Sequence, residues 1–283
     1  MTKFGPHGNS LSFYNQGNLH TYQSMKWIAD MGLNAFEYPA GKGVKISEET
    51  CKKIGEEASK YNIAISLHAP YYLNLANTEV EKREKSIEHI FDSLKALKAM
   101  GGKRLVFHCG YYMGQSSGQT LKRIKEEIVT VIERMKEQGY EDILLCPETL
   151  GKKGQFGTVE EIVSVCKISK QLVPCVDFGH VYARSLGKIN STKQFEEVLQ
   201  TISDGLGEET MQKLHIHFSH IEYTNAGEKV HHTLSNTQWG PDFNFLAKAL
   251  INKKCEPIII CESRDVMAED AVLMREIYNT ISL

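Results

Sequence analysis

Residues 104–148 have the sequence RLVFHCGYYMGQSSGQTLKRIKEEIVTVIERMKEQGYEDILLCPE, and this stretch decides the fold. The aliphatic runs at 104–108 and 143–148 have the length and composition of buried strands. Between them, residues 119–138 carry apolar side chains at the spacing of a helix that buries one face. The stretch is therefore predicted to be a strand–helix–strand unit whose two strands run parallel.

The same unit recurs along the whole chain. Eight apolar runs are predicted strands: Lys3–His7, Ala35–Tyr38, Ile63–His68, Arg104–His108, Ile143–Glu148, Pro174–Asp177, Leu214–Ser219 and Pro257–Glu262. Eight helical segments lie near 19–31, 47–60, 80–100, 119–138, 158–171, 191–204, 239–252 and 265–281, with Ser47, Thr158 and Ser191 as N-caps. This alternation predicts a (β/α)8 TIM barrel, a single domain over residues 1–283. An open doubly wound sheet is the alternative, but no GxGxxG turn follows an early strand.

Composition and charge exclude several classes of protein. Hydrophobic residues make up 41% and charged residues 24%, which is typical of soluble globular chains and not of disordered or fibrous ones. The net charge of −2 leaves no global positive field for nucleic acid, so a phosphate partner needs a local patch or a bound cation. The first residues lack the pattern of a signal peptide, and no apolar membrane span is expected. The seven cysteines include no CxxC pair. We therefore expect a cytoplasmic protein in a reducing compartment, without a membrane partner, and a monomer.

Histidine and carboxylate side chains recur at the ends of successive predicted strands. They are His68, His108, Glu148, Asp177, His217 and Glu262. The C-terminal strand ends of a barrel converge on one face, and buried carboxylates are costly unless a cation neutralises them. The mixture of imidazoles and carboxylates suits zinc, manganese or iron, so the sequence predicts a metal site on this face.

Other side chains near the strand ends have more than one interpretation. His180 follows Asp177 in a D-x-x-H spacing that can aim both into one site, whereas His231 and His232 lie in the longest predicted irregular region, 219–238. His215 is expected one layer deeper than His217 because it lies two positions earlier on the same strand and points to the same side. We expect three cysteines to lie between the barrel and the helices, namely Cys109, Cys146 and Cys261. Three rim cations either contact DNA phosphates or are simply solvated, namely Lys152, Lys153 and Arg184.

Seven motifs resemble the endonuclease IV family, the zinc-dependent apurinic/apyrimidinic endonucleases of the xylose-isomerase-like barrel superfamily. They are SLHAPYYLNLAN, VFHCGYYMG, CPETLGKKGQFG, CVDFGHVYA, IHFSH, KVHHTL and CES, in family order from about residue 60 to 265. The resemblance implies a metal-dependent phosphodiesterase that hydrolyses duplex DNA 5′ to abasic sites in base excision repair. It also implies that Tyr71, Tyr72 and Leu73 contact the DNA.

The resemblance assigns the ligands of two zinc ions and part of a third site. His68 and His108 would bind one zinc and share the catalytic, bridging Glu148 with a second, which Asp177, His217 and Glu262 complete. The third zinc would take His180 and His231.

Two positions depart from the family pattern. Lys229 stands where the family has an aspartate ligand. The neighbouring Glu228 could turn in, but it is one residue out of register with that position and is expected to face away, so the third site is expected to be weakened or lost. The chain would then hold two or three zinc ions. The loop FEYPAGKGVKIS also lacks the arginine and tryptophan with which family members enter duplex DNA.

Two other functions stay open. One is a sugar isomerase or epimerase of the same superfamily, which uses one divalent ion. The other is a metal-binding homologue with little nuclease activity.

Overall fold

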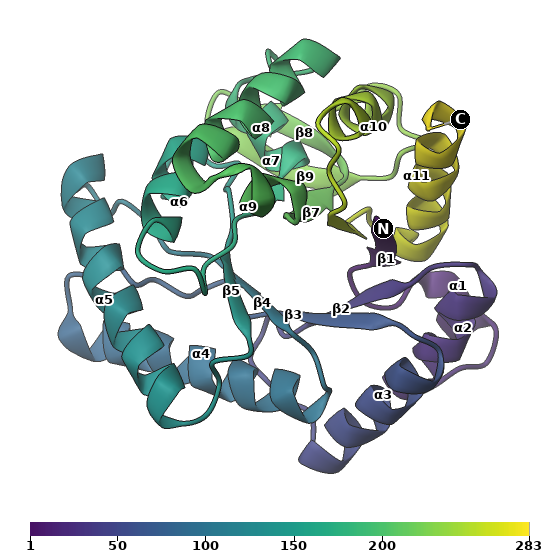
Figure 1. The fold of residues 1–283 in the computed structure, drawn as a ribbon, viewed down its shortest axis with the longest axis horizontal. Helices are drawn as coiled ribbons and strands as arrows, with labels where there is room; N and C mark the ends of the chain where they lie inside the picture. The colour runs from purple at the N-terminus through teal and green to yellow at the C-terminus, as the bar shows by residue number, and fades with distance from the viewer. Residues whose placement is uncertain (283) are drawn as a thin grey trace.

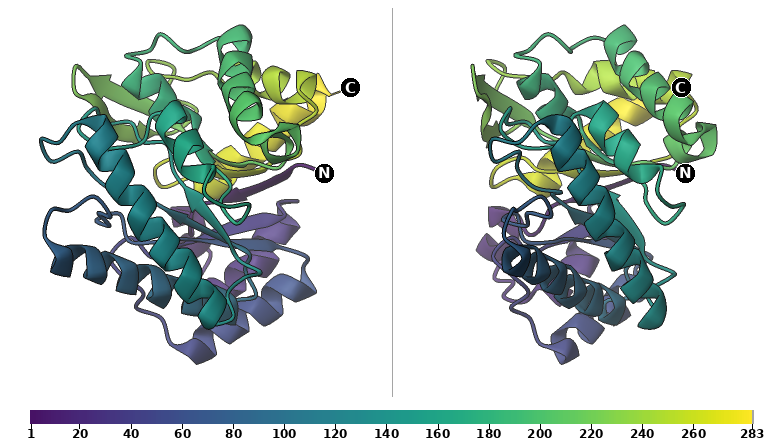
Figure 2. Two further views of the ribbon diagram at one scale, coloured as in Figure 1. Left: turned by 60° about the vertical axis from the view of Figure 1, so that its left-hand side comes forward. Right: turned by 90° about the vertical axis from the view of Figure 1, so that its left-hand side faces the viewer.

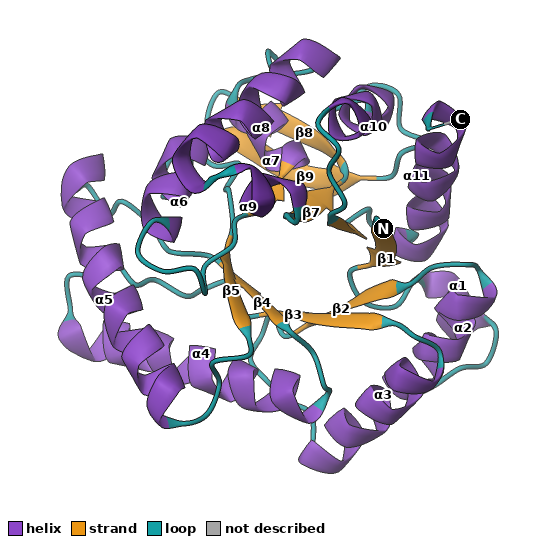
Figure 3. Ribbon diagram, viewed as in Figure 1, coloured by secondary structure: helices purple, strands orange, loops and turns teal. Residues whose placement is uncertain are grey.

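Eight parallel strands form a closed ring in the computed structural model, which describes residues 1–282, and the helices surround this ring (Figures 1 and 3). The barrel strands are β1 (Lys3–Pro6), β2 (Ala35–Pro39), β3 (Ala64–His68), β4 (Arg104–Phe107), β5 (Leu144–Pro147), β6 (Cys175–Asp177), β7 (His215–Phe218) and β10 (Ile258–Cys261). Each coincides with a predicted strand within two residues at either end, and the predicted TIM barrel is confirmed.

Two four-stranded parallel sheets make up the ring, with the strand orders β1-β10-β7-β6 and β2-β3-β4-β5. Single bridges join them at two seams, His7 with Glu37 and Glu148 with Cys175. At the first seam a Cβ on Gly5 would lie 1.8 Å from the Ala35 carbonyl oxygen, so only glycine lets these two strands approach. The closure brings side chains from opposite halves of the sequence into one barrel interior.

The helices follow the strands as predicted, and some of them are shorter than predicted. They are α1 (Leu11–Asn15), α2 (Ser24–Asp30) after a 3-10 turn at Thr21–Gln23, α3 (Glu48–Lys60), α4 (Val80–Ala99), α5 (Ser117–Glu137), α6 (Val159–Cys166), α7 (Phe178–Arg184), α8 (Thr192–Leu206), α9 (Glu208–Gln212), α10 (Phe243–Asn252) and α11 (Met267–Ile281). The hydroxyls of Ser47, Thr158 and Ser191 each accept a backbone N–H bond at a helix start, so all three predicted caps are confirmed. Helix α6 stops at Cys166, short of the predicted 171, and α1, α7 and α9 were not predicted.

The main hydrophobic core lies between the strands and the helices. Cys109 and Cys261 are buried there as expected. Cys146 instead packs with Val106 and Cys175 in a separate cluster, so its predicted position was wrong. The reason is strand alternation: Cys146 and Glu148 are two positions apart in the sequence, so both face the barrel interior.

A β-hairpin replaces the predicted irregular region after β7. Its strands, β8 (His220–Thr224) and β9 (Gly227–His232), pair antiparallel and stand on the rim of the barrel (Figure 2). This prediction was wrong because cross-strand pairing in this region does not follow from local apolar spacing. None of the helices in residues 1–282 is long and apolar enough to cross a membrane.

Candidate metal centre

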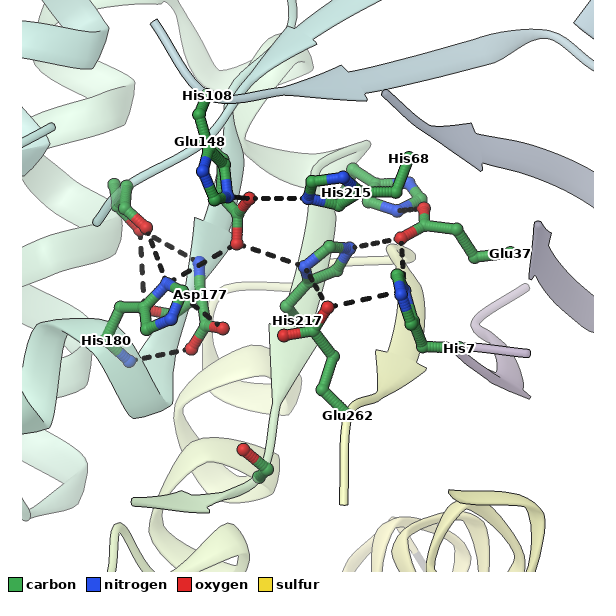
Figure 4. Close-up of polar contacts among 12 residues, drawn as sticks. His7, Glu37, His68, His108, Glu148, Asp177, His180, His215, His217 and Glu262 are labelled. Atoms are coloured by element: carbon green, nitrogen blue, oxygen red, sulfur yellow. Dashed lines mark hydrogen bonds and ion pairs between the residues drawn. The ribbon is translucent and has the colours of Figure 1, made fainter. Parts of the chain in front are cut away.

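The structure brings all eight predicted ligands to the C-terminal end of the barrel, and Figure 4 labels all of them except His231. A cavity of about 280 Å³ is lined by His68, His108, Glu148, His180, His231 and Glu262. Asp177 and His217 lie wholly buried beneath it. Two groups of these residues, and a third group that adds Glu228, each bring at least three ligand atoms within 4.8 Å of one another.

The first cluster consists of His68, His108 and Glu148. Both imidazoles present Nε2 to the same carboxylate oxygen, Glu148 Oε2, at 3.0 Å. His68 donates its Nδ1–H to the Ala69 carbonyl at 2.7 Å, so its Nε2 carries a lone pair toward the cavity when the ring is neutral. The two imidazoles and the carboxylate are thus oriented as they would be around a shared metal ion.

The second cluster consists of Glu148, Asp177, His217 and Glu262. His217 Nδ1 lies 3.2 Å from Glu148 Oε1 and 3.3 Å from Glu262 Oε1. Asp177 accepts the His180 backbone N–H at 2.7 Å through Oδ1, which begins helix α7, while its Oδ2 has no hydrogen-bond partner. The two oxygens of Glu148 thus face different clusters, which is the geometry needed by a bridging carboxylate.

The third cluster consists of His180, His231 and Glu228. Glu228 Oε2 lies 3.3 Å from His180 Nε2, and Glu228 Oε1 lies 3.8 Å from His231 Nε2. Lys229 instead points to solvent, where its Nζ lies 2.5 Å from Glu222 Oε1. The expectation that Glu228 faces away from the site was therefore wrong.

A bulge in the hairpin explains this placement. Glu228 and Val230 pair with consecutive residues of β8, so Lys229 between them is an extra residue. In an unbroken strand Lys229 and His231 would face the same side. One extra residue shifts this alternation by one position, which puts Glu228 on the side of His231.

Backbone contacts hold the hairpin against the loop that follows β5. Glu228 N donates to the Gly151 carbonyl at 3.2 Å, and Lys153 N donates to the Ala226 carbonyl at 2.9 Å. Gly227 has a φ of +96°, and a Cβ on it would lie 2.1 Å from the Gly151 carbonyl oxygen. Glycine at 227 is thus required for the approach that carries Glu228 to His180.

The pKa values of the side chains at the centre are set by burial and by the opposite charges of their neighbours. Burial by itself lowers the pKa of His68, but the hydrogen bond and charge of Glu148 outweigh it and raise that pKa to about 9. Without a metal, His68 thus carries a proton at neutral pH. A metal ion would replace this proton.

The pKa values of the carboxylates are also set by burial and by neighbouring charges. Burial raises the pKa of Asp177 to about 6, because it outweighs the neighbouring His180 charge. Burial also raises the pKa values of Glu228 and Glu262, but the charges of His180 and His217, respectively, outweigh it and hold both near 2. The charges of these three carboxylates are thus balanced mainly by imidazolium groups.

The residues present fit divalent metal ions. Within the described residues, five of the seven buried side-chain polar atoms without a hydrogen-bond partner lie at or just below the cavity, namely His108 Nδ1, Gln155 Oε1, Asp177 Oδ2, His215 Nδ1 and His217 Nε2. Imidazole and carboxylate donors in these proportions are the ligands of zinc, manganese and iron sites. That these side chains are ligands stays a prediction.

Sequence reasoning missed two residues of the centre. His7 lines the cavity, and its Nδ1 lies 3.1 Å from Glu37 Oε1. Glu37 is wholly buried on β2. His7 stands at the end of the first predicted strand, so the positional pattern that identified the other ligands already included it. His215 lies buried one layer below the site, as predicted.

The expected DNA contacts divide into two groups. Tyr71 and Tyr72 are 50% and 44% exposed on the rim, next to His68. Leu73 is wholly buried in the main core, so we leave it out of the proposed contacts. Arg184 donates to three carbonyls of the loop after β5 and therefore holds that loop in place.

Comparisons with known proteins agree with the fold. The chain is 36% identical over 260 residues to an uncharacterised protein of Methanocaldococcus jannaschii, covering 92% of each chain. It is 27% identical over 243 residues to a probable endonuclease 4 of Aquifex aeolicus, covering 82% of each.

Solved structures of two kinds share the fold. Endonuclease IV of Thermus thermophilus superposes with a TM-score of 0.70 at 18% identity, covering 99% of this chain and 98% of that one. A D-tagatose 3-epimerase-like protein superposes with a TM-score of 0.73 at 22% identity and the same coverage. The model of one family matches residues 25–277, and the chain belongs to this family, the xylose isomerase-like TIM barrels.

Proposed function

We propose that the protein is a metal-dependent phosphodiesterase that hydrolyses DNA 5′ to abasic sites. The observation that carries this proposal is the position of Glu148, whose two oxygens face two ligand clusters while a third cluster, with Glu228, shares the same cavity. A cavity surrounded by three such clusters suits a substrate that develops negative charge on several oxygens at once, as a phosphodiester does. The likeness to proteins named endonuclease 4 supports the same activity.

The residues of this chain would hold and orient the reacting groups. Divalent ions, when bound, would supply a nucleophile from water near neutral pH and neutralise charge on the phosphoryl oxygens. Glu148 would fix the spacing of two ions, and His68 and His180, each hydrogen-bonded through Nδ1 to a backbone carbonyl, would hold their Nε2 atoms toward the cavity. We propose zinc as the ion, because five of the eight predicted ligands are imidazoles.

The rim residues would contact the nucleic acid. Tyr71 and Tyr72 pack edge to face with ring centroids 5.7 Å apart, and both are exposed beside the cavity. An aromatic ring here would stack where an abasic site leaves a gap. Lys152 lines the same cavity and would meet a backbone phosphate.

A sugar epimerase is the second candidate function. Glu148, Asp177, His217 and Glu262 by themselves offer four ligand atoms to one ion, and the fold is shared with epimerases. This function leaves the third cluster without a role. The two candidates therefore differ in whether Glu228 and His231 matter for turnover.

One experiment separates the candidates. Zinc-loaded protein is incubated with an abasic-site duplex, an undamaged duplex and a panel of ketoses, and metal content is measured on the same preparation. We expect incision of the abasic duplex alone, with a 3′-hydroxyl product, and loss of incision in Glu228→Gln. Epimerisation of a ketose without DNA incision would overturn the proposal.

A further inference from the structure

Glu37 is a buried carboxylate beneath the metal centre that the proposed mechanism does not use (Figure 4). Four donors surround its two oxygens. Ser66 Oγ donates to Oε2 at 2.8 Å, and His215 Nε2 lies 2.9 Å from the same atom. His217 Nε2 and His7 Nδ1 lie 2.9 and 3.1 Å from Oε1. A carboxylate this deep in a barrel is costly, so its surroundings suggest a role in the site above it.

His217 links Glu37 to the second cluster. Its Nδ1 faces Glu148 and Glu262, while its Nε2 faces Glu37. The Nε2 atom is within hydrogen-bond distance of Glu37 Oε1 but not aligned with it in the metal-free structure. A neutral imidazole has one N–H, so a ring that binds an ion through Nδ1 must carry its hydrogen on Nε2, where Glu37 is placed to accept it.

A second route leads from Glu37 to the same cluster. His7 Nδ1 lies 3.1 Å from Glu37 Oε1 and 3.3 Å from Glu262 Oε1. The histidines of the third cluster are supported elsewhere, His180 by the Thr149 carbonyl and His231 by Ser219 Oγ. Glu37 therefore reaches two ligands of the second cluster, while the third cluster has its own supports.

We propose that Glu37 is a positioning residue that selects the Nε2–H form of His217 and thereby sets metal affinity in the Glu148–Asp177–His217–Glu262 cluster. This inference rests on the metal-binding part of the proposed function. Outer hydrogen-bond partners of metal-bound histidines typically contribute ten- to a hundredfold to affinity, and no other carboxylate contacts His217 Nε2 in residues 1–282.

The test compares Glu37→Gln with Ser66→Ala. Glutamine has the size of glutamate but a single acceptor oxygen, so it cannot serve the rings of His215 and His217 together. Ser66→Ala removes another donor to Glu37 and leaves the carboxylate in place, which makes it the matched control. Zinc affinities are measured by chelator competition, and cobalt-substituted protein reports the ligand geometry through its visible spectrum.

We expect one class of metal site in Glu37→Gln to weaken about ten- to a hundredfold, with an altered cobalt spectrum, while the remaining classes stay at wild-type affinity. Ser66→Ala should match wild type, and Glu37→Asp, which keeps the charge, should recover part of the loss. Unchanged affinities in Glu37→Gln, or an equal loss in every class, would overturn the inference and leave the proposed function standing. A wild-type chain that binds no zinc would overturn both.

A second measurement needs no variant. Nitrogen NMR of zinc-loaded wild-type protein identifies which ring nitrogen of His217 carries hydrogen. Hydrogen on Nε2 supports the inference, and hydrogen on Nδ1 refutes it even if Glu37→Gln does not fold.

Discussion

Replacing Glu228 by glutamine should remove the third metal ion and leave the other two clusters loaded. The carboxylate lies 3.3 Å from His180 Nε2 and 3.8 Å from His231 Nε2. At 3.3 Å two unit charges interact by on the order of 5 kcal/mol at an effective dielectric constant of about 20. Removing the Glu228 charge would remove an attraction of this order for a cation at that distance, but water at the cavity would compensate much of the difference. We therefore expect metal affinity at this cluster to fall at least about ten- to a hundredfold, or about 1.4–2.7 kcal/mol.

The matched control is the neighbouring lysine. Lys229 Nζ contacts Glu222 on the solvent side of the hairpin, so Lys229→Ala should leave the metal content unchanged. Metal is counted by native mass spectrometry and by elemental analysis after dialysis against a weak chelator. If Lys229→Ala releases an ion and Glu228→Gln does not, the bulge argument is refuted.

Further predictions concern the other two clusters, the rim and the barrel. Glu148→Gln should lower metal content and abolish DNA incision, since it removes charge from two clusters at once; full zinc content with wild-type turnover would contradict this role. In the metal-free protein the pKa of His68 is about 9, above the ordinary 6.5, so its proton must leave on metal binding. Apparent zinc affinity should therefore rise as pH increases from about 6.5 to 9, with proton release seen by calorimetry in buffers of different ionisation enthalpy. Tyr72→Ala should weaken binding of abasic duplex by about ten- to a hundredfold, because base–aromatic stacking contributes about 1–3 kcal/mol, and should spare a small phosphodiester; equal losses on both substrates would indicate a packing role. Chelation should abolish activity and lower the melting temperature only modestly, because the core lies between strands and helices; loss of helical circular dichroism on chelation would count against this.

Local periodicity was sufficient to predict the barrel. Each strand is a short apolar run followed by an amphipathic helix, and eight such units have few ways to close other than as a (β/α)8 ring. Strand alternation also located His215 below His217, because side chains two residues apart share a face. The same rule, applied to Cys146 from its distance to Glu148, would have placed that thiol inside the barrel.

Tertiary contacts decided the third cluster. From the sequence, Lys229 stands where the family has an aspartate ligand, and Glu228 is one residue out of register with that position. In the structure the hairpin has one extra residue and its backbone is bonded to the loop after β5 through Gly151, which turns Glu228 toward His180. Glu37 and His217 likewise meet only because the ring closes and brings β2 and β7 to one interior. A closed ring depends on pairing between residues far apart in the chain, and a bulge depends on pairing between the two strands of a hairpin. Periodicity within a single strand carries no information about either kind of pairing.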